Sequence, residues 1–314
     1  MNALRSSFLL QTRLGNLKGN LSAFLRKRNQ TILAYTLLAP DLIGIMIFVV
    51  LPIFMALFMS LTDWSGLKES TFIGLTNYKT MFKDELWRKS IVTTFIYVTV
   101  MIPATTIAAL GLALFVTSKH FKFRDFFRMT FFSPYMLPLI VVSVTWKFIY
   151  DPLGGFLNFV LRTFNFPKLA WLGSVDTALL CIMIVSLWWI AGYYMIIFVA
   201  GLNDIPREFL DAAAIDGASK TQTFFHITIP LLKPTLTFVL VILTIDSFQL
   251  FDMVYVMTRG GPARSTHVNV LYIYEKAFIH HDMGYASAIA FFLCVIIFLV
   301  SIFLLKILRT GRID

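Results

Sequence analysis

Six stretches of the sequence are apolar and long enough to cross the hydrocarbon core of a bilayer, which takes about 20 residues of α-helix. They lie at residues 33–60, 91–117, 129–149, 178–201, 235–257 and 285–305. Of the 314 residues, 58% are hydrophobic and only 14% are charged, whereas a soluble domain is close to half apolar and a quarter charged. The chain is therefore predicted to be an all-α integral membrane protein with six transmembrane helices.

Lys and Arg residues are distributed unequally between the segments that connect these stretches. With the N-terminus inside, the inner segments hold 16 of them and the outer segments hold 10. Residues 26–28, Arg-Lys-Arg, directly precede the first stretch, and such charge is retained on the cytoplasmic side. We therefore predict that both termini are cytoplasmic.

The chain is predicted to consist of three parts: a cytoplasmic N-terminal segment 1–30, a six-span domain 31–310 with a cytoplasmic loop 203–233, and a cytoplasmic tail 311–314.

We interpret the net charge of +10 as the result of Lys and Arg residues that collect in the cytoplasmic segments. No basic run is expected to be interleaved with exposed aromatic residues, so no nucleic-acid partner is expected. The first thirty residues are polar and basic, and no small-residue cleavage site follows a short apolar core, so they are not predicted to be a secretory signal peptide.

The sequence shows no arrangement that predicts catalysis or metal binding. Residues 216–221 only superficially resemble a phosphate-binding loop, because no second glycine precedes the lysine and no strand precedes the segment. Cys181 and Cys294 both lie in apolar stretches and are expected to be packing residues. The histidines form no ligand set and are expected to be solvated loop residues: His120, His226, His267, His280 and His281. We predict that the chain is not an enzyme and binds no metal or cofactor itself.

The inner loop 203–233 is predicted to form a helix–turn–helix hairpin. Ile205-Pro206 opens the first helix, with Glu208 near its positive end. Residues 212–214 are alanines, and Gly217 can take the left-handed conformation that ends a helix. A second short helix is expected from about Ala218 to Pro230. The alanine-rich surface favours docking into a groove of another protein, and the alternative is a loop that packs on its own bundle.

This loop resembles the EAA loop of bacterial ABC import permeases, whose pattern is Glu-Ala-Ala followed by a glycine and then by Ile-x-Leu-Pro. Here Asp211-Ala212-Ala213 stands for the leading triplet, Gly217 for the glycine, and residues 227–230 read Ile-Thr-Ile-Pro. In that family the loop fits into a cleft of the ATPase subunit. The resemblance therefore implies that the ATPase-coupling residues are Glu208, Asp211, Ala212, Ala213, Asp216, Gly217 and Ala218.

Four further segments extend the resemblance to the carbohydrate-uptake branch, and to the first (MalF-like) permease of maltose-type importers. They are residues 72–78, 132–138, 251–262 and 284–288. The resemblance implies a bacterial cytoplasmic membrane protein that forms a path with a second homologous permease. Two ATPase subunits would bind ATP and magnesium inside, and an extracytoplasmic solute-binding protein would deliver a carbohydrate outside.

One face of the fifth stretch is a candidate solute path, because Leu243, Asp246, Ser247 and Leu250 recur at helical spacing. Polar groups on such a face turn toward the bundle interior, where they either meet solute or form hydrogen bonds between helices. The resemblance implies solute contacts on this stretch and at the end of the fourth one, best at Ser247 and Tyr193, with Trp189 one turn before Tyr193. Asp246 is a candidate from its place on the polar face, and Gln249 is a further candidate that lies off this face.

An ion-coupled secondary transporter is the alternative function. Asp246 and Asp252 are the acids nearest the middle of a stretch, while Asp41 and Lys147 lie near the ends of theirs. Ion coupling usually needs more such groups on several helices. Dependence of uptake on ATP or on an ion gradient distinguishes the two functions.

Overall fold

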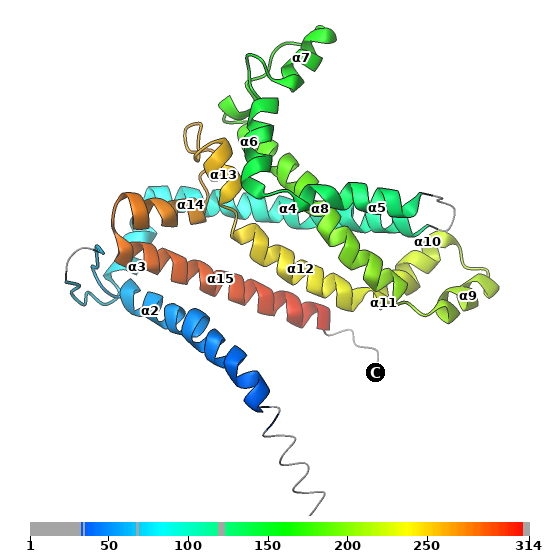
Figure 1. Cartoon of the computed structure of the whole chain (residues 1–314), viewed down its shortest axis with the longest axis horizontal. Helices are drawn as coiled ribbons and strands as arrows, with labels where there is room; N and C mark the ends of the chain where they lie inside the picture. The colour runs from blue at the N-terminus through cyan, green and yellow to red at the C-terminus, as the bar shows by residue number, and fades with distance from the viewer. Residues whose placement is uncertain (1–32, 34, 67–68, 119–122, 310–314) are drawn as a thin grey trace, which may run out of the picture. The chain divides into compact units, whose positions relative to one another are not determined.

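A computed structural model gives the fold and describes residues 33, 35–66, 69–118 and 123–309 (Figure 1). The predicted cytoplasmic segment 1–30 and tail 311–314 lie outside the described residues. Within the described part of the chain every regular element is helical, apart from one isolated antiparallel bridge between Thr62 and Phe72. The prediction of an all-α protein is confirmed.

Five helices among the described residues are long and apolar enough to cross a membrane, and a bent pair raises the number to six if it counts as one span. The five extend over Tyr35–Ser60, Glu85–Thr117, Ala178–Asn203, Lys233–Met257 and Met283–Leu308. Within Lys233–Met257, residues 249–251 interrupt the helix. Each overlaps one of the predicted stretches.

The third predicted stretch, 129–149, is not one straight helix. Arg124–Met136 and Leu139–Ile149 meet at an angle of 95°. The first member is α5 (Arg124–Phe132) followed by a 3₁₀ turn, and the second is α6 (Leu139–Ile149). Leu137, between them, has extended backbone, with φ −80° and ψ 137°. The cause is Pro138, because a proline disfavours the α conformation of the residue before it and has no N–H to continue a helix.

The described residues divide into two compact units, one that ends at Phe58 and one that begins at Met59. The first unit holds a π-helical turn (Met46–Val50) and most of α2 (Leu51–Ser60), which together end the first candidate span.

In the second unit, α4 (Glu85–Thr117) and α8 (Ala178–Asn203) pack along one another (Figure 1). Ala109 and Ala113, one turn apart on α4, are fully buried in a cluster with Tyr194 and Phe198 of α8. Small residues at this spacing let two membrane helices approach closely. The remaining long helices are α12 (Lys233–Phe248), which packs on α4, and α15 (Met283–Arg309), which packs on α12.

Short helices connect these elements. They are α3 (Thr76–Lys83), α7 (Phe156–Thr163), α9 (Arg207–Ile215), α10 (Lys220–Thr223), α11 (Ile229–Leu231), α13 (Asp252–Met257) and α14 (Asn269–Tyr274). The prediction that His267 is a solvated loop residue is wrong. This residue lies in the loop before α14. Its side chain is buried, and its Nε2 lies 3.0 Å from Oε2 of Glu275.

The carboxylate of Asp84 ties the start of α4 to two other helices. It accepts hydrogen bonds from the backbone N–H groups of Leu86 (2.9 Å) and Trp87 (3.3 Å). The hydroxyls of Tyr272 in α14 and Tyr285 in α15 donate to the same carboxylate, Tyr285 over 2.8 Å. Burial alone would raise the pKa of Asp84, but these hydrogen bonds outweigh it and hold the pKa below its ordinary value.

Replacing Asp84 by asparagine is expected to lower the free energy of unfolding by about 1–2 kcal/mol, because an amide NH₂ cannot accept from a tyrosine hydroxyl. The folded-state pKa lies below the unfolded one. The carboxylate therefore stabilises the fold fully above its unfolded pKa of about 4, and this contribution is lost as the pH falls through the folded pKa. Thermal unfolding at neutral and acidic pH should show that the wild type loses more stability on acidification than the variant.

The control is the neighbouring change Glu85→Gln, which removes an exposed ion pair with Arg88 at 3.7 Å. Such a pair contributes about 0–1 kcal/mol. If Asp84→Asn and Glu85→Gln unfolded at the same temperature at neutral pH, the stabilising role of Asp84 would be contradicted.

Candidate functional site

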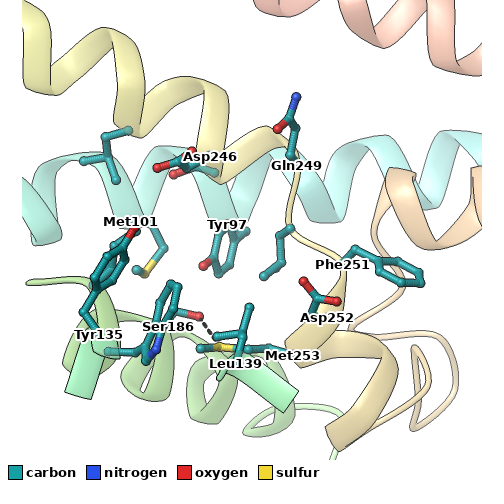
Figure 2. Close-up of a pocket in the computed structure, with 15 residues that line it drawn as sticks. Tyr97, Met101, Tyr135, Leu139, Ser186, Asp246, Gln249, Phe251, Asp252 and Met253 are labelled. Atoms are coloured by element: carbon teal, nitrogen blue, oxygen red, sulfur yellow. Dashed lines mark hydrogen bonds between the residues drawn. The ribbon is translucent and has the colours of Figure 1, made fainter. Parts of the chain in front are cut away.

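A cavity of about 250 Å³ lies between α4, α8, α12 and the bend that joins α5 to α6 (Figure 2). Its lining residues come from helices far apart in the sequence. They are Tyr97, Met101, Tyr135, Leu139, Ser186, Trp189, Ile190, Leu243, Asp246, Ser247, Gln249, Leu250, Phe251, Asp252 and Met253.

The bend supplies an aromatic wall. Because the helix stops before Pro138, Tyr135 turns toward α8, where its ring stacks on Tyr193 with centroids 4.5 Å apart and planes 21° apart. Trp189, one turn earlier on α8, lies 4.8 Å from the Tyr135 ring. Its indole Nε1 donates to the carbonyl oxygen of Leu137 over 3.3 Å. This hydrogen bond satisfies a carbonyl freed at the break and fixes the bend against α8.

The facing wall comes from a second helix break. The fifth predicted stretch, 235–257, is not helical throughout, because α12 ends at Phe248 and α13 begins at Asp252. Leu250 of the predicted face therefore lies beyond the helix end, although it still lines the cavity. The carboxylate of Asp252, at the start of α13, points toward the other lining side chains, whereas the amide of Gln249 points away from them (Figure 2).

Asp246 lies on α12 with its side chain exposed, and its Oδ2 accepts a hydrogen bond from the Tyr194 hydroxyl over 2.7 Å. The neighbouring Ser247 is almost buried, with 5% of its surface exposed. On the α8 side, the hydroxyl of Ser186 donates to the sulfur of Met253 over 3.0 Å, which holds α13 against α8.

The arrangement favours binding over bond-breaking chemistry. Aromatic faces, hydroxyls and carboxylates meet around one space, and this combination suits a polyhydroxylated solute with apolar C–H faces. Among the residues that the structure covers, no group of three or more His, Cys, Asp or Glu side chains could hold a metal ion.

Four of the five predicted path residues line this cavity: Trp189, Asp246, Ser247 and Gln249. Tyr193 is one layer behind, stacked on the lining residue Tyr135. Sequence reasoning missed other polar lining residues. Helical spacing along α8 could have added Ser186, which lies three residues before Trp189. No local pattern indicated Tyr97 or Tyr135, because their placement depends on packing between helices and on the bend.

The loop 203–233 contains a helical hairpin formed by α9 and α10, hereafter the α9–α10 hairpin (207–223). Gly217 has φ +73°, the left-handed conformation expected of it. Its N–H donates to the carbonyl of Ala214 (3.2 Å), and the N–H of Ala218 donates to that of Ala213 (2.9 Å). This pair of bonds is the Schellman motif that ends many helices.

The second helix departs from the prediction at both ends. It begins at Lys220, because Ser219 caps it and Gln222 reaches back to the Ser219 N–H, a capping box whose Ser-x-x-Gln signature is visible in the sequence. It does not stop at Pro230. A π-helical turn (Phe224–Thr228) precedes the proline, and helix continues to Leu231.

Most of the predicted coupling residues are on the surface of the hairpin. Glu208, Asp211, Ala212, Asp216 and Gly217 are exposed, Ala218 is half-buried, and Ala213 is buried. Large apolar side chains lie open beside them, with Ile215 87% exposed and Phe209 51% exposed.

Comparison with known proteins identifies a family and a shared fold. Residues 70–310 match the family described as "Binding-protein-dependent transport system inner membrane component". The probable ABC transporter permease protein YurN of Bacillus subtilis (strain 168) is 37% identical, over 90% of this chain and 97% of YurN. The trehalose/maltose transport system permease protein MalF of Thermococcus litoralis is 32% identical, over 93% and 99%. A chain of a bacterial ABC transporter involved in the import of the acidic polysaccharide alginate has the same fold, with a TM-score of 0.81, 21% identity and coverage of 91% and 98%.

Proposed function

Because this chain belongs to the family of binding-protein-dependent transport system inner membrane components, we propose that it forms, with a second homologous permease, the transmembrane path of an ATP-driven saccharide importer. It is a multi-pass permease of the inner membrane and catalyses no reaction itself. Partner ATPases hydrolyse ATP, and a binding protein outside delivers the solute. The trehalose/maltose permease among its relatives supports a sugar or oligosaccharide as cargo.

The observation that carries the proposal is the cavity at the two helix breaks. Irregular backbone is tolerated at membrane depth only where it is buried in protein or lines a water-filled space, and both breaks face this cavity. Its volume of about 250 Å³ is below the 300–1,000 Å³ typical of a complete ligand site. A path shared with a second permease accounts for this, since this chain then supplies one wall.

The α9–α10 hairpin is the proposed coupling element. Its exposed Phe209 and Ile215 form an apolar surface suited to a cleft in an ATPase. The exposed acids Glu208, Asp211 and Asp216 lie close to them in the sequence. Because the ATPases are cytoplasmic, an ATPase docked on the hairpin requires that the hairpin and both termini lie in the cytoplasm. The positive charge of residues 26–28, before the first span, agrees with this orientation. Closure of the ATPases would then move α8 and α12, which flank the hairpin in sequence and form walls of the cavity.

Two substitutions test the path. Ser247→Leu is expected to lower uptake at least about tenfold, because a larger apolar side chain enters the cavity, and Tyr193→Ala at least about threefold, because Tyr135 loses its stacking partner. Both variants should assemble normally. Uptake in membrane vesicles that hold the whole importer, with the amount of complex measured in parallel, gives the result.

Each variant has a matched control. Thr237→Leu makes a similar hydroxyl-to-leucine change on α12 outside the cavity, and Tyr193→Phe retains the stacked ring. Wild-type uptake by Ser247→Leu and Tyr193→Ala together would mean that the solute passes elsewhere.

A further inference from the structure

The cavity contains two carboxylates and no cationic side chain. Asp246 and Asp252 both line it, and both residues have exposed surface. None of its fifteen lining residues is Lys, Arg or His. The charge of this wall is therefore negative.

No other group of this wall could neutralise an anionic solute. The Trp189 N–H is already bonded to the Leu137 carbonyl, and the Gln249 amide points away (Figure 2). The N-terminus of α13 already carries Asp252 in its first turn, where an acid complements the helix dipole. Lys147 of α6 is eight residues beyond the lining residue Leu139, which corresponds to about 12 Å of helix.

We propose that this subunit selects for saccharides without anionic groups, by presenting the carboxylates of Asp246 and Asp252 to the solute. The inference rests on the proposed function and adds the charge class of the cargo. Neutral sugar hydroxyls donate to the two carboxylates, and hydrogen bonds to an ionised acceptor are stronger than neutral ones. A uronate or sulfonate in the same place meets two like charges without a counter-ion.

The expected discrimination is large. A like charge about 6 Å away, at the effective dielectric constant of about 20 for a partly solvated site, lowers affinity by roughly a hundredfold. Salt in a water-filled path screens part of this. Solutes with one carboxylate should therefore bind at least about tenfold more weakly than their neutral counterparts.

The test uses the complete importer in lipid nanodiscs without its binding protein, so that solute choice rests on the membrane subunits. The probes are short neutral oligosaccharides and the uronates made from them by oxidising one C6 hydroxymethyl group, which adds a carboxylate and keeps the ring. Tryptophan fluorescence reports binding, and the Trp189→Phe variant identifies the part of the signal that comes from the cavity.

The wild type should bind each neutral sugar at least about tenfold more tightly than its uronate. Asp246→Asn combined with Asp252→Asn should reduce that ratio below about threefold. Asparagine at position 246 retains an oxygen that can accept from Tyr194. The control is Asp125→Asn, which removes a carboxylate of α5 outside the cavity and should leave the ratio unchanged.

Two results would overturn the inference alone: equal or tighter binding of the uronates by the wild type, or an unaltered ratio in the double variant. If no saccharide of either kind binds, and the importer with its binding protein and ATP takes up none, the proposed function itself is wrong and this inference falls with it.

Discussion

Replacing Gly217 by valine is expected to weaken docking of the ATPase and thereby to lower ATP-driven uptake. Gly217 has φ +73°, a conformation that costs an L-residue about 1–2 kcal/mol and costs a β-branched residue at least that much. An added Cβ would meet nothing within 4 Å, so the effect arises from the backbone alone. The turn opens, the Schellman hydrogen bonds are lost, and α10 changes direction relative to α9.

A penalty of this size lowers the population of the docked hairpin by roughly 5- to 30-fold. The measurements are co-purification of the ATPase with the permease and ATP-driven uptake in vesicles, and both should fall. Insertion of the spans should not change. Gly217→Asn is the matched control, because asparagine tolerates the left-handed region, and it should retain most of the uptake. If the valine variant held its ATPase and imported at the wild-type rate, the hairpin would not be the coupling element.

Replacing Gly192 by alanine is expected to be the most damaging single-methyl change in α8. A Cβ there would overlap the carbonyl oxygen of Phe131 and lie 2.9 Å from the Cα of Phe132. These are backbone atoms at the end of α5, so no side-chain rotation relieves the overlap. Overpacking of this kind costs about 3 kcal/mol or more, and it displaces the bend that holds Tyr135 in the cavity wall.

Thermal unfolding and uptake of the purified importer measure this effect, and both should decrease in Gly192→Ala. The control is Gly111→Ala in α4, where an added Cβ meets nothing within 4 Å. Alanine is a better helix former than glycine by about 0.5–1 kcal/mol, so this variant should be unchanged or slightly more stable. Equal unfolding temperatures for the two variants would contradict the close approach of α5 to α8.

Hydropathy predicted the long helices because each must satisfy its backbone hydrogen bonds within itself in lipid. It did not predict the break at Leu137. Pro103 and Pro138 both lie within predicted stretches, yet Pro103 is inside the continuous helix α4 and Pro138 ends one. The difference depends on tertiary contacts, such as the Trp189 hydrogen bond to the freed Leu137 carbonyl, and no local sequence pattern carries these contacts.

Helical spacing predicts only those residues of the candidate site that lie on one continuous helix. Asp246 and Ser247 stand out because polar residues are rare in a span and helical spacing assigns them to one face. Asp252 was noticed as an acid near the core but not as a site residue, because a continuous helix would have turned it elsewhere. The break after α12 brings it to the cavity.

Uptake into proteoliposomes tests whether this chain transports saccharide only as part of an ATP-driven importer. The liposomes contain either the complete importer or this chain alone, and uptake is measured with ATP, with an ATPase-inactive partner, and with an imposed ion gradient. The complete importer should take up saccharide only with ATP, an active ATPase and binding protein, and it should be insensitive to ionophores. This chain alone should neither hydrolyse ATP nor accumulate solute. Accumulation driven by an ion gradient in liposomes that contain only this chain would show that it is a secondary transporter and not a subunit of an ATP-driven importer.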